Sequence, residues 1–305
     1  MATALAKIIL HNQAQIGWYI RSDEQIEYQI AHGHNPKYIS SVELPAKRVR
    51  YSSDLNAIVY NASHLIFAVP SPFLKDTIEG LDTNYKDKFI ISAIKGIVPG
   101  ENLTIAEYFN KVHNVSFDNI GIITGPCHAE EVALERMSYL TVAAKDKDQA
   151  ELIAQNLRAH YIRANTVKDI YGIEYASVLK NIVAIASGIC HGLGYGDNFQ
   201  AVLISNAMQE MKRFLDKTYK SKRKMNSSPY LGDLLVTAYS QFSRNRLFGT
   251  MVGKGYSIKA AQLEMNMVAE GYYASRCIYE INQKHKVSMP IMEAVYNIVY
   301  RKYRP

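Results

Sequence analysis

The chain has 305 residues, of which 48% are hydrophobic and 21% charged, and its formal net charge is +7. These proportions are typical of a globular protein with a substantial core, built as one large or two medium domains. No apolar run reaches the roughly 20 residues that cross a bilayer, and residues 1–10 lack a signal-peptide pattern. We therefore expect no membrane partner.

The cysteines and the basic residues limit the protein class further. Cys127, Cys190 and Cys277 lie far apart and form no CxxC pair, which favours a reducing cytoplasm and argues against disulfides or a metal site. The basic run at residues 217–224 is typical of a solvated loop, so we expect no nucleic-acid partner. The basic balance suits a small anionic substrate and a phosphate-rich cofactor.

The first half of the chain alternates short apolar runs with helical patterns. A helical pattern at 2–9 leads directly into a strand pattern at 15–20. Buried runs separated by helices predict a parallel, doubly wound sheet, which is a nucleotide-binding architecture. The other predicted strands are 65–69, 88–93, 119–124 and 141–144, and the predicted helices are 22–31, 72–81, 103–112 and 129–135.

From about residue 167 the strand signals fade and long helical patterns follow. We therefore predict an α/β dinucleotide-binding domain of residues 1–166, followed by an all-helical substrate and catalytic domain of residues 167–305. Pro290 lies where proline is favoured, in the first turn of a helix. The predicted helices are 172–193, 200–219, 257–265, 269–286 and 290–300.

The order of elements at the start of the chain is unusual. A dinucleotide-binding fold runs strand, glycine loop, helix and strand, and its second strand ends at the residue that contacts the ribose. This chain begins with the helix, so one interpretation is that it enters in the middle of that unit. A helix-first α/β domain is an equally good interpretation of the pattern alone.

Two polar segments follow directly after predicted strands, where open α/β sheets bind ligands. Lys95 follows the strand at 88–93 and is either a ligand-facing lysine or a surface lysine that closes the strand. Gly125 begins a Gly-Pro turn that opens a helix, and its free backbone N–H groups suit an anion or a carbonyl oxygen. His128 has no partner in the sequence and is more often a structural histidine.

A lysine interrupts the most apolar helix of the chain. Residues 175–189 are apolar nearly all round, so this helix should be buried, yet it contains Lys180 and Asn181. A buried lysine must be paired or neutralised, and burial lowers the pKa of a lysine toward the range that a general acid or base requires. The pattern favours a functional lysine over one that only extends to the surface.

Two later segments offer partners for a lysine and for a phosphate. Asp233 lies beside a glycine and before an apolar run, so it could hold a buried lysine. Ser243, Arg244 and Asn245 combine a hydroxyl, a guanidinium fork and an amide, a set that suits a phosphate group. Alone, this triplet is a weak signal.

Taken in register, these segments resemble the bacterial type of the NAD(P)-dependent glycerol-3-phosphate dehydrogenase family. Each motif alone is weak, but their order and spacing hold along the whole chain, which makes the set specific. The motifs are residues 34–38, 68–71, 94–97, 125–126 with 129–132, 179–188, 192–198, 232–234, 243–246 and 268–271.

The resemblance implies a set of site residues. Lys180 would be the catalytic acid/base, with Lys95 and Asp233 beside it in the catalytic and substrate site. Gly125 and Cys127 would contact the substrate, although the family usually has serine or threonine at the position of Cys127. The phosphate would be bound by Ser243, Arg244 and Asn245, and the cofactor by Arg21, Lys95, Ala129, Arg244, Val268 and Glu270.

The resemblance also implies the reaction and its setting. The enzyme would reversibly reduce dihydroxyacetone phosphate to sn-glycerol 3-phosphate, in support of glycerophospholipid synthesis, as a cytoplasmic homodimer without a metal. Arg21, at the end of the ribose-contacting strand, suits a 2′-phosphate, so NADP is as good a cofactor as NAD.

The chain departs from the family pattern at its front. The family begins with a strand and the string G-x-G-S-W-[GA]-T-A-L-A, and residues 2–6 match only the end of that string. We therefore expect a Rossmann-like domain that is truncated at its N-terminus. A late start codon and a genuine short form with impaired cofactor binding both remain open.

Two other functions compete with this one. A β-hydroxyacid dehydrogenase also joins a nucleotide domain to a helical domain, but in that family the lysine and asparagine lie about one helical turn apart, whereas Lys180 and Asn181 are adjacent. A non-catalytic binding protein would be compatible with the absent glycine loop, but the retained Lys95, Asp233 and Arg244 argue against it.

Overall fold

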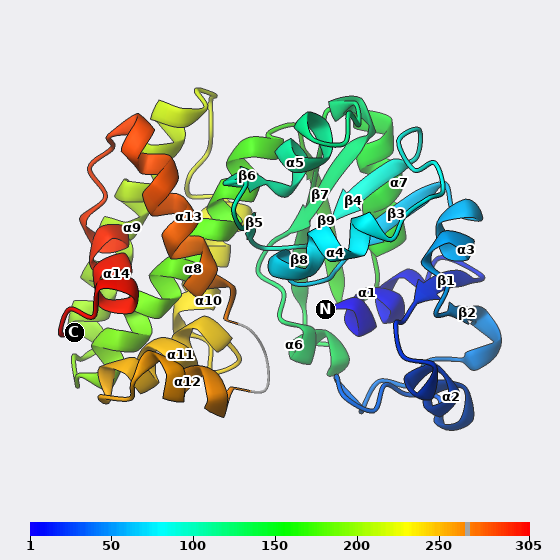
Figure 1. The fold of residues 1–305 in the computed structure, drawn as a ribbon, viewed down its shortest axis with the longest axis horizontal. Coiled ribbons are helices and arrows are strands. Elements are labelled where there is room, and N and C mark those ends of the chain that lie inside the picture. Colours follow the sequence, from blue (N-terminus) through cyan, green and yellow to red (C-terminus); the bar gives the residue numbers. More distant parts are fainter. Residues whose placement is uncertain (266–268) are drawn as a thin grey trace. The chain divides into compact units, whose positions relative to one another are not determined.

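The computed structural model describes residues 1–265 and 269–305, which form two compact units. Unit 1 comprises Met1–Val69, Phe73–Ile94 and Phe109–Ile170, and unit 2 comprises Pro70–Pro72, Lys95–Tyr108 and Tyr171–Pro305. The units are therefore not two consecutive stretches. A division after residue 166 separates the long segments of the chain, but two short segments before that point pack with unit 2. Figure 1 labels the elements of both.

Two sheets form the frame of unit 1. The larger sheet has the strand order β3-β4-β7-β8-β9, and β4 and β7 are buried at every position, as strands covered on both faces should be. A separate parallel pair consists of β1 (Ile16–Tyr19) and β2 (Val49–Ser52). The larger sheet contains β3 (His64–Phe67), β4 (Phe89–Ser92), β7 (Ile120–Thr124), β8 (Ser138–Ala144) and β9 (Ile162–Val167).

The prediction of a wholly parallel sheet is wrong at one pair of strands, because β8 runs antiparallel to β7. The connection between them contains only α6 (Ala129–Ala133), which is too short to carry the chain back along the sheet. From β8 to β9 the chain passes through the longer helix α7 (Lys147–Leu157), and this pair is parallel. Connection length therefore explains the strand directions.

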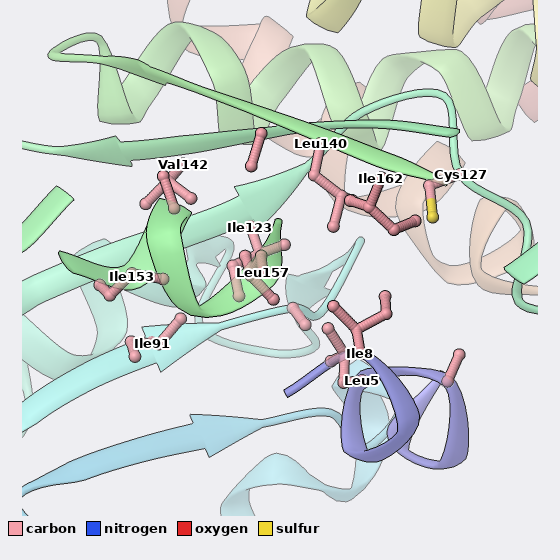
Figure 2. Packing of buried hydrophobic residues seen from close by; sticks show 14 of the residues in the cluster. Leu5, Ile8, Ile91, Ile123, Cys127, Leu140, Val142, Ile153, Leu157 and Ile162 are labelled. Atoms are coloured by element: carbon pink, nitrogen blue, oxygen red, sulfur yellow. The ribbon is translucent and has the colours of Figure 1, made fainter. Parts of the chain in front are cut away.

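Helix α1 (Ala2–Ile9) packs on α6 and α7 and contributes to the core of unit 1. Leu5 and Ile8 of this helix are 3% and 1% exposed. Figure 2 shows them in one apolar cluster with side chains of β4, β7, β8, α7 and β9. Apart from one helix described in the next paragraph, the remaining helices before residue 120 are α2 (Asp23–His32), η1 (Ala46–Arg48), α3 (Leu55–Tyr60), η2 (Ser71–Phe73), α4 (Leu74–Glu79) and η3 (Phe117–Asn119).

The helix predicted at 103–112 begins later than its pattern indicates. Leu103–Thr104 is the short strand β6, which pairs with β5 (Ile97–Val98), and α5 follows at Ile105–Lys111. The reason is local: the Thr104 side chain accepts from Glu107 N (3.3 Å) while the Glu107 side chain accepts from Thr104 N (3.2 Å). This capping box makes Thr104 the N-cap of α5.

Unit 2 is built around helix α8 (Ile170–Gly192). By length and composition α8 could cross a membrane, but 94% of its most apolar stretch is buried within the protein, as in the core helix of a globular domain. The two helices at 233–253 were not identified from the sequence pattern. The other elements are α9 (Asp197–Thr218), the π-helical turn η4 (Ser228–Gly232), α10 (Asp233–Tyr239), α11 (Arg244–Gly253), α12 (Ile258–Glu264), α13 (Glu270–His285) and α14 (Pro290–Arg301).

Glycines allow α8 and α11 to touch backbone to backbone. A Cβ on Gly249 would lie 2.1 Å from Ile185 O, and one on Gly253 would lie 2.3 Å from Ile189 O, so neither position tolerates a side chain. Ile185 is opposite Gly249 and Ile189 is opposite Gly253, so residue numbers increase in the same direction along both helices and α8 and α11 run parallel. One turn earlier, the same spacing places Asn245 opposite Asn181. A Cβ on Gly188 would likewise lie 2.1 Å from Arg246 O, and one on Gly192 would lie 2.5 Å from Thr250 O.

Candidate active site

A buried ion pair forms the centre of the candidate site. Lys180 of α8 is 4% exposed, and its Nζ donates a hydrogen bond to Oδ1 of Asp233, which is 1% exposed. The opposite charges offset the cost of removing both groups from water. The sequence-based pairing of Asp233 with a buried lysine is therefore confirmed.

Local backbone structure presents Asp233 to the lysine. The residue directly follows η4, a π-helical turn of a kind that is rare and often occurs at functional sites. The helical backbone of η4 continues through Gly232 into α10, so the Asp233 backbone is held by η4 carbonyls. Thr237 Oγ1 donates to Asp233 O at 2.6 Å and closes the first turn of that helix.

Asn181 connects Lys95 to the same helix. The Asn181 amide nitrogen donates to Lys95 O at 2.9 Å, so the backbone of Lys95 is fixed next to the residue that follows Lys180. The half-buried Lys95 side chain forms no hydrogen bond or ion pair with the residues that the structure describes, and its ammonium group is available to a ligand. Asn181 was not among the site residues predicted from the sequence, where its only signal was a polar side chain on a buried helix.

A second buried contact joins Ser71 to Glu270. The Glu270 carboxylate accepts from Ser71 N (2.9 Å) and Ser71 Oγ (2.6 Å). A Cβ on Gly96 would lie 2.4 Å from Ser71 Oγ, so only glycine fits beside this pair. Burial raises the pKa of Glu270, and the Ser71 hydrogen bonds and the nearby Arg244 charge oppose that rise. Ser71 is a further residue that sequence analysis did not assign to the site.

The predicted phosphate-binding residues lie at the N-terminus of α11. Ser243 caps the helix by accepting from Arg246 N at 3.3 Å, and Asn245 Oδ1 accepts from Gly271 N at 2.9 Å. Their oxygens are thus used within the protein, which leaves the Ser243 hydroxyl proton and the Asn245 amide protons as donors. Arg244 is exposed beside them. This set of donors and one cation suits an anionic group.

The site residues predicted in unit 1 have different environments. Arg21 is exposed directly after β1 and has no hydrogen bond or ion pair within the described part of the chain, so its guanidinium is free for a phosphate. Gly125 has φ +125°, and its absent Cβ would lie 2.6 Å from Tyr139 O. Ala129 begins α6 and packs on the core. Val268 lies outside the described residues.

Cys127 lies in the interior of unit 1. Its side chain is 6% exposed and belongs to the apolar cluster that Figure 2 shows, with the sulfur among Leu140, Ile162 and other core residues. A thiol in this setting behaves as a small hydrophobic group. Packing therefore accounts for the cysteine without a ligand, and the substrate contact expected for Cys127 stays a prediction.

The structure thus brings one group of the predicted residues together within unit 2. Hydrogen bonds and close packing connect α8, the Lys95-Gly96 turn and the N-termini of α10, α11 and α13. The connected predicted residues are Lys95, Lys180, Asp233, Asn245 and Glu270, with Ser243 and Arg244 adjacent on α11.

Comparisons with known proteins identify the same family in both halves of the chain. The family model of the NAD-dependent glycerol-3-phosphate dehydrogenase N-terminus matches residues 2–150, and the model of the C-terminus matches residues 169–305. A curated glycerol-3-phosphate dehydrogenase (NAD(P)+) of Carboxydothermus hydrogenoformans is 33% identical over 304 residues, which are 99% of this chain and 90% of that protein. Its counterpart from Bacillus cytotoxicus is 34% identical over an alignment of 308 residues, gaps included, and the alignment covers 98% of this chain and 88% of that protein.

Solved structures show the same fold. The glycerol-3-phosphate dehydrogenase of Coxiella burnetii has a TM-score of 0.88 at 26% identity, covering 99% of this chain and 92% of that chain. The corresponding Dunaliella salina structure has a TM-score of 0.90 at 22% identity, covering 99% of this chain and 56% of that chain. The predicted fold class, a Rossmann-like domain followed by a helical domain, is confirmed.

Proposed function

The chain belongs to the NAD(P)-dependent glycerol-3-phosphate dehydrogenase family, and we propose that its catalytic centre is the buried Lys180–Asp233 pair. The protein is an oxidoreductase that reversibly reduces dihydroxyacetone phosphate to glycerol 3-phosphate with NAD(P)H. The single observation that supports the choice of centre is a lysine that is 4% exposed, held by a carboxylate inside an otherwise apolar helix. A β-hydroxyacid dehydrogenase or a non-catalytic binding protein is not favoured.

Residues of both units suit the cofactor. The free Arg21 guanidinium in unit 1 has the chemistry to bind a nucleotide phosphate, and Ala129 is assigned to the same cofactor. In unit 2 the assigned residues are Lys95, Arg244 and Glu270, and Val268 joins them by resemblance. When bound, NAD(P)H supplies the hydride that reduces the ketone carbon.

Lys180 is the general acid and base for the substrate oxygen. Its ammonium group donates a proton to the substrate oxygen as the ketone becomes an alcohol, and it recovers that proton in the reverse reaction. Asp233 holds Nζ in one position and stabilises its positive charge. The unpaired ammonium of Lys95, on a backbone fixed by Asn181, stabilises the negative charge that develops on the oxygen.

The N-terminus of α11 binds the substrate phosphate. Arg244 supplies the charge, while the Ser243 hydroxyl and the Asn245 amide supply further donors. Because Asn245 is level with Asn181, this anchor orients the ketone end of the substrate without taking part in the chemistry.

The setting of the enzyme follows from the resemblance and from the cysteines. We propose a cytoplasmic homodimer that works without nucleic acid, membrane or metal, with residues 1–166 serving the cofactor and 167–305 serving the substrate and the chemistry. The product supports glycerophospholipid synthesis.

The function is tested by following NADH and NADPH oxidation with dihydroxyacetone phosphate in wild-type protein and in Lys180→Ala. Loss of general acid catalysis should lower kcat by roughly two to four powers of ten while the substrate still binds. The control is Lys212→Ala, which removes an exposed lysine from a surface ion pair and should leave kcat unchanged. A Lys180→Ala enzyme with near wild-type kcat would refute the role of this lysine.

A further inference from the structure

The segment that carries Lys95 belongs to unit 2, although the chain on both sides of it belongs to unit 1. Residues 95–108 leave unit 1, form the β5-β6 hairpin and begin α5 (Figure 1). Hydrogen bonds tie both ends of this excursion to α8. At one end Asn181 contacts Lys95 O, and at the far end the Glu174 carboxylate accepts from Ala106 N at 3.1 and 3.3 Å.

Glu174 is a buried charge that the proposed reaction does not use. It is 2% exposed and lies on α8, six residues before Lys180, which is about 9 Å along the helix. A buried carboxylate costs more free energy than an apolar side chain of similar size unless its bonds are well made. A buried carboxylate at this position therefore calls for a reason beyond filling space.

Glu174 completes the N-terminal cap of α5 from another helix, because it accepts from Ala106 N, an N–H that the capping box does not reach. The capping box itself consists of the reciprocal hydrogen bonds of Thr104 and Glu107. By accepting from Ala106 N, Glu174 connects α5 to α8, next to a longer hydrogen bond from the Tyr175 hydroxyl of α8 to Glu107 Oε2 (3.4 Å). With the Asn181 contact, it fixes both ends of the excursion to the helix that carries Lys180.

We propose that Glu174 is a positioning residue for Lys95: it anchors the excursion of residues 95–108 to α8 and thereby sets the position of the Lys95 ammonium for the substrate. The proposal rests on the proposed function, in which Lys95 acts on the bound ketone. Glu174 touches neither substrate nor cofactor in this role. It acts through the backbone N–H of Ala106.

The ionisation of Glu174 gives this anchor a pH dependence. Burial raises the pKa of Glu174 to about 7, while hydrogen bonds from Thr104 and from the α5 backbone lower it and the Glu107 charge raises it. The other titratable groups facing this cluster are Tyr171 and Tyr175 of α8; burial raises the pKa of Tyr171 to about 12 and that of Tyr175 further. Charge-assisted hydrogen bonds are the stronger ones, so the anchor weakens as the pH falls through about 7.

Substrate binding and stability therefore respond to pH in opposite directions. The pKa of Glu174 is raised in the folded state from 4.5 to about 7, so its contribution to stability is complete below pH 4.5 and is lost as the pH rises through 7. The charged form, which anchors Lys95 better, exists above that pH. We expect the KM for dihydroxyacetone phosphate to rise, through this group, as the pH falls from 8 to 6.

Glu210 provides a matched control. It is 1% exposed on α9, and its carboxylate accepts from Ile291 N (2.8 Å) and Met292 N (3.3 Å) at the N-terminus of α14. Burial raises its pKa as well. Glu210 thus makes the same kind of contact in the same unit, but it holds a helix that does not carry Lys95.

The experiment compares Glu174→Gln and Glu210→Gln with wild type. Glu174→Gln, which keeps the shape of the side chain, should raise KM for dihydroxyacetone phosphate about tenfold, corresponding to about 1.4 kcal/mol, with kcat changed less than about threefold. It should also flatten the part of the pH profile of KM between 6 and 8 that wild type and Glu210→Gln retain. Glu210→Gln should keep the wild-type KM.

A second measurement does not depend on activity. Hydrogen exchange of residues 95–108, read by mass spectrometry, should be about tenfold faster in Glu174→Gln than in wild type and unchanged in Glu210→Gln. Glu174→Asp, which keeps the charge but is one methylene shorter, should change exchange and KM in the same direction and serves if the glutamine variant does not fold.

Wild-type KM and exchange in the Glu174 variants, or the same KM rise in Glu210→Gln, would overturn the proposal. If wild-type protein does not reduce dihydroxyacetone phosphate, the proposed function is wrong, and the exchange measurement still decides whether Glu174 anchors the segment.

Discussion

The two units differ in whether they bury charged side chains. Within unit 1, all of which the structure describes, no charged side chain is classed as buried, and Arg21, which the resemblance assigns to the cofactor, is exposed two residues after β1. Over its described part, unit 2 buries four charged side chains in addition to the charges on its surface. Among the residues that the structure describes, the charged side chains classed as buried all lie in unit 2: Glu174, Lys180, Glu210 and Asp233.

In the proposed function this difference corresponds to a cofactor-binding unit and a unit that carries the reaction centre. An apolar core under a sheet can hold ligand groups at strand ends without burying charge, which suits cofactor binding. A proton donor needs a defined, water-poor position, and its burial has a cost in stability that partners must offset. The following variants test whether that division holds, from the largest expected effect to the smallest.

Asp233→Leu should break the interior of unit 2. It leaves the Lys180 ammonium buried without its carboxylate, which costs roughly 3–5 kcal/mol of unfolding free energy. Urea unfolding followed by circular dichroism measures the loss. Asp216→Leu is the control, because its pair with Lys212 is exposed and should be worth less than about 1 kcal/mol. Equal stability of the two variants would mean that Lys180 is not held as a buried charge.

Arg244→Ala should weaken the phosphate anchor. Losing a charge-assisted hydrogen bond costs roughly 1.5–3 kcal/mol, so KM for dihydroxyacetone phosphate should rise by about one to two powers of ten. Unphosphorylated dihydroxyacetone, which lacks the anchored group, should show almost no change. The comparison is made by steady-state kinetics on both ketones, and similar effects on the two would place Arg244 away from the phosphate.

Cys127→Ser tests whether unit 1 contributes only packing at this position. A hydroxyl buried in the apolar cluster should cost about 1–3 kcal/mol, and KM should stay within twofold of wild type. Cys277→Ser, at a buried cysteine of α13 with no assigned role, is the control. If Cys127→Ser instead lowers KM severalfold, the substrate contact implied by the family resemblance is correct and the thiol is more than a core residue.

Many of the helices and strands could be predicted from local sequence patterns. The strand predicted at 119–124 is β7 at Ile120–Thr124, and the helix predicted at 290–300 is α14 at Pro290–Arg301. The buried Lys180–Asp233 pair was also accessible from the sequence, because a lysine inside an apolar helix is a strong local anomaly. By contrast, β9 was missed: its burial alternates and its run contains arginine, asparagine and threonine. Such a segment becomes a strand because β8 pairs with it.

The sequence by itself determined which segments are apolar, where helices are capped and which polar residues stand out on buried faces. These properties depend on neighbours within a few positions. Tertiary structure decided the antiparallel β7-β8 pair, the transfer of residues 95–108 to unit 2 and the contact of Ser71 with Glu270, 199 positions apart. Such contacts depend on how far the chain can reach and on which backbones glycine lets approach. Local periodicity carries no information on either.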